Sequence, residues 1–177
     1  MKKIFILLFA LISLGLLAIP YLGAEEVTVT MNLVTKDGVG KKIGTVALSD
    51  SPYGLILRPN LEGLKPGIHG FHVHQNPDCG PAKAGGKMVP GLAAGGHLDP
   101  GNTERHEGPY GNGHLGDLPV LPVDRNGKAT VPLLAPRLKT SDVKGHSLLI
   151  HVGGDNYSDK PKKLGGGGPR AACGIIR

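Results

Sequence analysis

Eight histidines in a chain of 177 residues fall into groups whose spacing is typical of metal sites. His72 and His74 are two positions apart in an apolar run, so in a strand both rings would project from one face. Two imidazoles held side by side can bind one metal ion, although a His-x-His pair also arises by chance. His151 ends another apolar run and would add a third imidazole if the two runs form neighbouring strands. Imidazole-rich sites suit Cu²⁺ as well as Zn²⁺, so the residue types alone leave the metal open.

A second group of candidate ligands lies in a long segment without a regular hydrophobic pattern: His97, His106, His114 and Asp117. Three imidazoles and one carboxylate can complete the tetrahedral coordination that Zn²⁺ prefers. His114 and Asp117 are three positions apart in a glycine-containing turn, a spacing that lets both side chains reach one ion. The other two histidines, His69 and His146, fit neither group, and we interpret them as structural or exposed residues.

Short strands are the elements expected to position these residues. The 29 glycines and 15 prolines disfavour long helices, because each interrupts a helix interior. Residues 26–33 alternate between apolar and polar side chains, which is typical of a half-buried strand. Similar runs predict strands at residues 43–48, 53–58, 68–74, 118–123, 128–134, 147–152 and 171–176. Eight short strands joined by glycine- and proline-rich turns predict an all-β barrel or sandwich.

The connections between these runs differ in length. Residues 124–127, with the sequence Asp-Arg-Asn-Gly, predict a hairpin turn. Two other connections, at about residues 75–117 and 153–170, are far too long for hairpins. Long loops in a compact domain usually carry function. The first contains the second ligand group and the other a lysine- and glycine-rich tract, so we predict two functional loops.

The N-terminus has the pattern of a secretory signal. Lys2 and Lys3 precede an uncharged apolar stretch at residues 4–19, and Ala24 offers a small residue for cleavage. We therefore expect a signal peptide at residues 1–24, one domain at residues 25–177, and export to a bacterial periplasm. An uncleaved N-terminal anchor is the alternative. Cys79 and Cys173 both lie in the exported part, where an oxidising compartment favours a disulfide between them over two buried thiols.

The charge and composition exclude one class of partner. The formal net charge of +6 is spread along the chain, aromatic residues are few, and no basic helix or stripe stands out. Nucleic-acid binding is therefore a poor interpretation, and attraction of a small anion fits the mild basic balance better.

The order and spacing of these motifs resemble the copper–zinc superoxide dismutases over essentially the whole exported part. The motifs are residues 70–74 (Gly-Phe-His-Val-His), His97, His106, residues 114–117 (His-Leu-Gly-Asp), His151 and residues 168–176 (Gly-Pro-Arg-Ala-Ala-Cys-Gly-Ile-Ile). The Gly-Gly-Asp-Asn after His151 and the Leu-Gly-Gly-Gly-Gly tract are similar to the exported bacterial branch. The resemblance implies an eight-stranded antiparallel Greek-key barrel or sandwich with two long functional loops.

When the functional residues of the family are assigned to the matching positions of this sequence, the resemblance implies one copper and one zinc per subunit. The expected copper ligands are four histidines: His72, His74, His97 and His151. The expected zinc ligands share one of these: His97, His106, His114 and Asp117. Asp155 would link one imidazole of each site from outside, and Arg170 would receive the anion beside copper. Cys79 and Cys173 would form the family's disulfide and tie the first long loop to the last strand.

The implied activity is dismutation of superoxide to O₂ and H₂O₂, which would protect the cell envelope from oxidative damage. Copper would cycle between redox states, zinc would be structural, and His97 would bridge both metals and take up a proton. The resemblance leaves monomer and homodimer open, and we expect no stable membrane association after signal cleavage.

Two alternatives accompany this interpretation. Lys160, Lys162 and Lys163 form either a solvated charge run or a tract that helps to attract superoxide. The whole chain could instead be an exported metal-binding or metal-buffering module on the same barrel. The complete set of seven ligand positions together with Arg170 favours the enzyme over that module.

Overall fold

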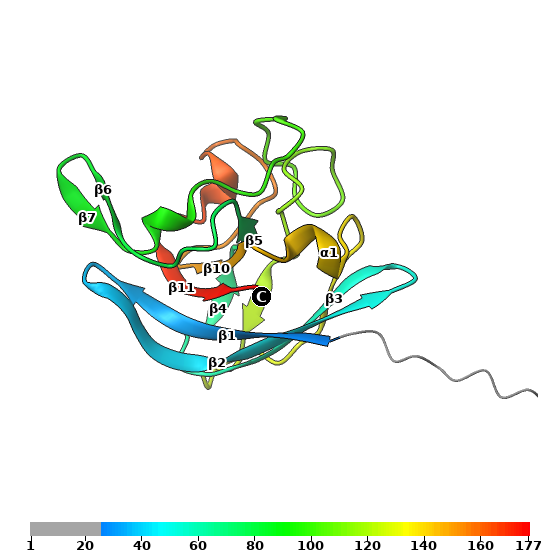
Figure 1. Cartoon of the computed structure of the whole chain (residues 1–177), viewed down its shortest axis with the longest axis horizontal. Helices are drawn as coiled ribbons and strands as arrows, with labels where there is room; N and C mark the ends of the chain where they lie inside the picture. Colours follow the sequence, from blue (N-terminus) through cyan, green and yellow to red (C-terminus); the bar gives the residue numbers. More distant parts are fainter. Residues whose placement is uncertain (1–25) are drawn as a thin grey trace, which may run out of the picture.

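The structure is a computed structural model that describes residues 26–177, so the predicted signal peptide lies outside the described residues. Its strands are β1 (Glu26–Thr35), β2 (Gly38–Ser51), β3 (Gly54–Leu61), β4 (Gly67–His69), β5 (Phe71–His74), β6 (Ala82–Ala84), β7 (Lys87–Val89), β8 (Leu121–Val123), β9 (Leu133–Ala135), β10 (Ser147–His151) and β11 (Arg170–Ile175) (Figure 1). Its short helices are α1 (Thr140–Val143), η1 (Leu92–Ala94) and η2 (Leu164–Gly166). Within residues 26–177, no helix has the length and apolar character needed to cross a membrane.

Seven strands form one curved antiparallel sheet in the order β5-β10-β11-β1-β2-β3-β9. Strands far apart in the sequence are neighbours, since β11 pairs with β1 and β10 pairs with β5. Such crossovers are those of a Greek-key connection rather than of a simple meander. A separate pair, β4 and β8, lies apart from this sheet. The predicted all-β antiparallel class is confirmed.

The hydrophobic pattern of the strands explains the core. In β1 the alternating residues Val27, Val29 and Met31 are buried, while their polar neighbours face outward. Leu148 and Ile150 of β10 are also fully buried against the same cluster. Full burial of one such side chain stabilises the fold by about 1.5–3 kcal/mol relative to exposure. The core is therefore mostly aliphatic, in keeping with the scarcity of aromatic residues.

The predicted strand at residues 68–74 is divided at Gly70 into β4 and β5. Gly70 lies outside both strands; its N–H donates to the Gly153 carbonyl, and its carbonyl accepts from the N–H of His151, the last residue of β10. The chain changes partners at this residue, from β8 on one side to β10 on the other. The change brings β5, with its two histidines, directly beside β10.

Two other segments differ from the sequence expectation. The strand predicted at residues 128–134 is reduced to β9, because Pro132 has no N–H for a ladder and Ala129 makes only an isolated bridge with Leu61.

The first long connection contains the short hairpin β6–β7, which the sequence analysis missed. Gly85 and Gly86 form its turn, both with positive φ, as tight hairpin turns require.

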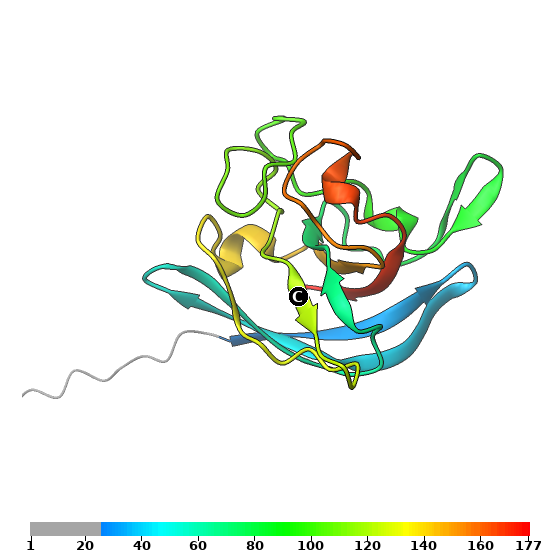
Figure 2. The same ribbon diagram turned by 180° about the vertical axis from the view of Figure 1, so that it is seen from behind.

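The two long loops lie together on the side of the molecule opposite β1–β3 (Figures 1 and 2). The disulfide predicted between Cys79 and Cys173 is present, with 5.6 Å between its Cα atoms. It joins the start of the first loop to β11, and both cysteines are buried. The metal-ligand candidates on the loops and on β5 and β10 thereby meet at one end of the fold.

Candidate metal centre

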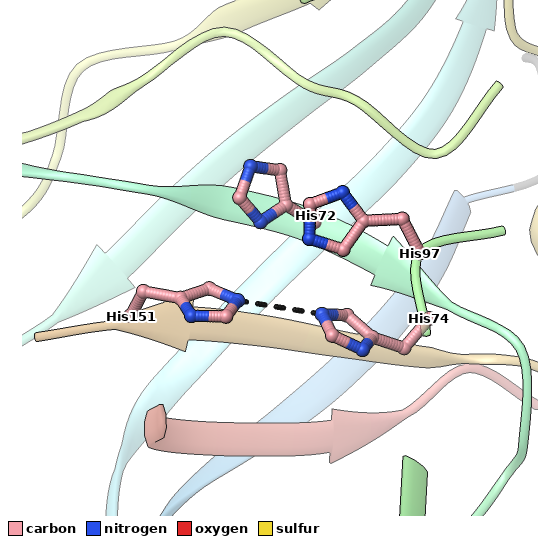
Figure 3. Close-up of side chains that lie close together, drawn as sticks. All are labelled: His72, His74, His97 and His151. Carbon is pink, nitrogen blue, oxygen red and sulfur yellow. Dashed lines mark hydrogen bonds between the residues drawn. The ribbon is translucent and has the colours of Figure 1, made fainter. Parts of the chain in front are cut away.

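Four buried histidines from three parts of the chain converge at this end. They are His72 and His74 of β5, His151 of β10, and His97 of the first long loop (Figure 3). One ring nitrogen from each lies within 4.8 Å of the corresponding nitrogens of the others. Nε2 of His74 and Nε2 of His151 are 3.4 Å apart. The pairing of β5 with β10 brings these histidines together, because His72 lies opposite Leu149 and His151 follows two residues later on the same strand.

The ring nitrogens that point away from this cluster are each fixed by a hydrogen bond. His74 Nδ1 is 3.0 Å from the Gly95 carbonyl oxygen, and His151 Nδ1 is 3.0 Å from the Gly168 carbonyl oxygen. His72 Nε2 is 2.7 Å from Asp155 Oδ2. A ring nitrogen that donates to an oxygen leaves its opposite nitrogen free as an acceptor or metal ligand. The arrangement therefore prepares three imidazoles to bind one ion.

A second cluster surrounds the carboxylate of Asp117. Its Oδ1 lies 2.9 Å from His97 Nδ1, 3.0 Å from His106 Nδ1 and 3.5 Å from His114 Nδ1. Its Oδ2 accepts the backbone N–H groups of Glu107 and Gly108. Three imidazole nitrogens and one carboxylate oxygen thus meet at one point, as a tetrahedral zinc site requires.

His97 belongs to both clusters. Its Nδ1 faces Asp117, and its Nε2 is buried on the side of the first cluster without a hydrogen-bond partner. Three further buried ring nitrogens make no well-formed hydrogen bond, although the last two face Asp117 Oδ1; they are His72 Nδ1, His106 Nδ1 and His114 Nδ1. Leaving one buried polar atom unsatisfied costs about 1–3 kcal/mol. Four such nitrogens in one place fit metal ions, which these atoms can bind.

Asp155 links the two clusters from outside. Its Oδ2 accepts from His72 Nε2 and its Oδ1 from His106 Nε2, each at 2.7 Å. The backbone N–H of Tyr157 also donates to Oδ1, and the carboxylate is fully buried. Asp155 therefore orients one imidazole of each cluster, which is the contact that the sequence analysis expected of it.

The pKa values of the buried histidines shift in two directions: burial lowers that of His97, which belongs to both clusters, and those of the strand histidines, whereas that of His106 rises. Burial lowers the pKa values of His72 and His74 well below the ordinary 6.5, and the neighbouring imidazoles lower them further. Burial likewise lowers the pKa of His151 to about 4. Burial also disfavours protonation of His106, yet the Asp117 and Asp155 carboxylates outweigh it and raise the pKa of His106 to about 9. The first cluster thus favours neutral imidazoles, which are the form that binds metals.

A cavity of about 260 Å³ opens onto the first cluster. It is lined by His74, Val89, Leu92, Gly96, His97, His151, Leu164, Gly168, Pro169 and Arg170. Arg170 Nη2 donates to the Gly95 carbonyl at 2.6 Å, the same carbonyl that His74 Nδ1 faces. This bond fixes a cation beside the histidines. Lys160, Lys162 and Lys163 are exposed, and none of them lines this cavity.

The two remaining histidines lie outside the clusters. His69 is buried, and its ring nitrogens are each 2.7 Å from a backbone carbonyl oxygen, those of His151 and Lys65. His146 Nδ1 is 2.7 Å from the Gln75 carbonyl oxygen. Both contacts are structural, as the sequence analysis expected. The carbonyl groups of Gly95 and Gly168 were missed, because a backbone acceptor leaves no signal in residue type.

Comparison with known proteins agrees with this geometry. The family described as copper/zinc superoxide dismutase matches residues 42–176. The superoxide dismutase [Cu-Zn] of Brucella abortus is 54% identical over 170 residues, which covers 96% of this chain and 98% of that protein. A Cu/Zn superoxide dismutase structure from Brucella abortus superposes with a TM-score of 0.85 at 55% identity, covering 86% of this chain and all of the other.

The solution structure of the monomeric copper, zinc superoxide dismutase from Salmonella enterica gives a TM-score of 0.78 at 58% identity. It likewise covers 86% of this chain and all of the other. Sequence similarity at this level spans nearly the whole chain and includes the segments that carry both histidine clusters. The chain therefore belongs to the copper/zinc superoxide dismutase family, as an oxidoreductase that uses copper and zinc.

Proposed function

We propose that this enzyme converts two superoxide ions and two protons into O₂ and H₂O₂ at the junction of the two histidine clusters. The observation that carries the proposal is the position of His97, whose Nδ1 faces one cluster and whose Nε2 faces the other. The proposed copper ligands are His72, His74, His97 and His151. The proposed zinc ligands are His97, His106, His114 and Asp117. Copper would supply one-electron chemistry, while zinc is redox-inert and would contribute structure.

The residues around the cavity would bind a small anion and supply a proton. The Arg170 guanidinium, held by the Gly95 carbonyl, offers N–H groups and positive charge next to the first cluster. His97 would hold a proton on Nε2 whenever that nitrogen is not bound to metal, and this proton would pass to the product peroxide. Asp155, Gly95 and Gly168 would keep the other imidazoles in place during the cycle.

We further propose that the protein works in the bacterial periplasm and protects the cell envelope. The signal pattern at residues 1–24 supports export, and the disulfide is of the kind that persists in oxidising compartments. One relative of known structure is described as monomeric, which supports a monomer, although the homodimer of the sequence analysis stays open to experiment.

Metal analysis combined with a superoxide-decay assay tests the proposal. We expect about one copper and one zinc per chain, rapid superoxide decay, loss of activity when copper is removed by a chelator, and recovery when copper is returned. The His146→Ala variant is the matched control, because the His146 ring is hydrogen-bonded to the Gln75 carbonyl and belongs to neither cluster, so both metals and the rate should be retained. A protein that binds both metals but does not consume superoxide would contradict catalysis and favour a metal-buffering module.

A further inference from the structure

Arg137 makes an unusual set of contacts with the loop that carries His106 and His114. Its Nε donates to the Pro109 carbonyl and its Nη1 to the Gly113 carbonyl, both at 3.1 Å. Its Nη2 donates to two more carbonyls, that of Gly108 at 3.1 Å and that of His114 at 2.5 Å. One guanidinium therefore binds four backbone carbonyls within the seven-residue segment 108–114. All four belong to the stretch that begins just after His106 and ends at His114.

This segment depends on outside partners because it has no regular secondary structure of its own. Its neck is closed by one backbone bond, from His114 N–H to the Arg105 carbonyl at 2.8 Å. Buried or half-buried carbonyl groups need hydrogen-bond donors, and a strand or helix would normally provide them. In segment 108–114 the Arg137 side chain provides these donors instead. It therefore satisfies the carbonyl groups of this segment as the backbone of a neighbouring strand satisfies those of β5.

Arg137 itself is attached to a well-fixed part of the barrel. It lies between β9 and α1, where Ala135 and Leu138 are buried in the core on either side. Thr140, three residues after Arg137, is anchored by Asp50. The Oδ1 atom of Asp50 accepts from the N–H of Thr140 at 2.7 Å and from its hydroxyl at 2.9 Å. The guanidinium is therefore positioned by the sheet, and its contacts transfer that rigidity to the loop.

We propose that Arg137 is a positioning residue for the zinc site, which holds His106 and His114 at the spacing that zinc requires. The proposal rests on the proposed zinc ligands. Only arginine suits the task, because its planar group carries five N–H donors in a fixed fork, whereas lysine has three donors on one nitrogen. Lysine at this position keeps the charge and most of the stem but cannot satisfy four carbonyls spread along the segment. Loss of the fork would free the loop and let zinc escape faster.

The test compares Arg137→Lys and Arg137→Met with wild type and with Arg58→Lys as the matched control. Arg58 also uses its guanidinium in a hydrogen bond, to Ser49 Oγ at 2.7 Å, but it lies on β3 away from the loops. Zinc release to a colorimetric chelator gives the dissociation rate, and Co²⁺ in place of zinc gives a visible spectrum that reports the coordination geometry. The melting temperature of each metal-free protein records general stability.

We expect zinc release to become about 10–100-fold faster in both Arg137 variants, the range found when groups that orient metal ligands are removed. The Co²⁺ bands should shift or weaken, while copper binding and Arg58→Lys stay near wild type. Unchanged release and spectra would overturn the proposal, as would a lower melting temperature without faster release, since that marks a merely structural contact. If wild type itself bound no zinc or Co²⁺, the proposed zinc site would fail, and the inference with it. If Arg137→Met does not fold, the milder Arg137→Lys variant decides the question.

Discussion

The two histidine clusters are built from different kinds of structure. His72, His74 and His151 of the first cluster stand on β5 and β10, which are hydrogen-bonded to each other and covered by the core. His106 and His114 of the second stand on an irregular loop whose shape depends on side-chain contacts from elsewhere in the chain. The first cluster is therefore positioned by the ladder of the sheet, and the second by single hydrogen bonds.

This difference has a consequence for what each cluster tolerates. Many backbone hydrogen bonds hold a strand in position, so the loss of one side-chain contact there leaves the ligands in place. The loop has few contacts, and each carries a larger share of its positioning. We therefore expect substitutions outside the ligand set to affect zinc more than copper. His97 and Asp155 each touch both clusters, so substitutions there should affect both metals.

The largest effect is expected from His97→Ala, because it removes a ligand from both sites at once. Both metals should be lost or weakly held, and superoxide consumption should fall to the background rate. His151→Ala should abolish activity too, but it should weaken copper chiefly and leave zinc bound. Metal content per chain after dialysis, measured beside the rate of superoxide decay, separates the two patterns. Full copper and zinc in His97→Ala would show that these ligands are wrongly assigned.

Arg170→Glu should produce the next largest effect, and it should act on rate without emptying the sites. Arg170 lies at the start of β11 and lines the cavity, so its charge acts where superoxide arrives. A favourable local field can raise association rates by roughly 10–1000-fold, and added salt suppresses this gain. We expect a much lower second-order rate constant and a lost or inverted salt dependence, measured by pulse radiolysis over an ionic-strength series.

Lys128→Glu is the control for charge reversal, because Lys128 is exposed next to the 124–127 turn and does not line the cavity. The Debye length is only about 8 Å at physiological ionic strength, so a distant lysine should contribute little. At equal copper content, parallel salt slopes for wild type and Arg170→Glu would exclude a steering role for Arg170.

Asp155→Asn should weaken both sites by a smaller factor. The carboxylate accepts from one ring nitrogen of His72 and one of His106, but an amide has only one oxygen to offer. Losses of this kind cost about 10–100-fold in metal affinity or activity. The measurement is retention of copper and zinc during a chelator challenge, with the zinc loss expected to be the greater. Retention equal to wild type would contradict the linking role of Asp155.

Asp124→Asn provides the matched control for that substitution. Asp124 Oδ1 also accepts two N–H groups, those of Asn126 and Lys128, but it does so in the 124–127 turn away from the metal sites. Its replacement should leave metal retention unchanged. If both variants lost metal equally, the effect of Asp155→Asn would reflect general instability rather than ligand orientation.

The sequence was most informative where a side-chain pattern determines the structure. The alternation in residues 26–33 predicted β1, and the spacing of His72 and His74 predicted two rings on one face of β5. The division of residues 68–74 at Gly70 was not predicted, because it depends on which strand each half meets in three dimensions. The hairpin at Gly85-Gly86 had a recognisable turn signal, which was overlooked inside a long polar connection.

Contacts with backbone groups could not be predicted at all. The acceptors for His74, His151 and Arg137 are carbonyl oxygens, which every residue possesses. Their position is known only once the loops are placed beside the strands. Asp155 was anticipated solely through the family resemblance, since its distance from both histidines in the sequence gives no hint of contact. The loop cluster was therefore less predictable than the strand cluster, for the same reason that it is less rigid.

The smallest predicted effect concerns the pH dependence of the metal-free protein, in which His151 and His106 should act with opposite signs. The pKa of His151 falls to about 4 in the fold, below its ordinary 6.5, so protons bind the unfolded chain more readily. Its stabilising contribution is complete above pH 6.5 and is lost as the pH falls towards 4. The pKa of His106 rises to about 9, so its contribution is complete below pH 6.5 and is lost as the pH rises through 9.

Melting temperatures of metal-free wild type, His151→Gln and His106→Gln between pH 8.5 and 5 would separate these contributions. Wild type should become less stable towards pH 5, because four histidines have a lowered pKa and only His106 has a raised one; the four are His72, His74, His97 and His151. His151→Gln should show a shallower decline, and His106→Gln a steeper one, with differences of about 2–4 °C for each kcal/mol involved. Identical slopes for the two variants would contradict the opposite pKa shifts of His151 and His106.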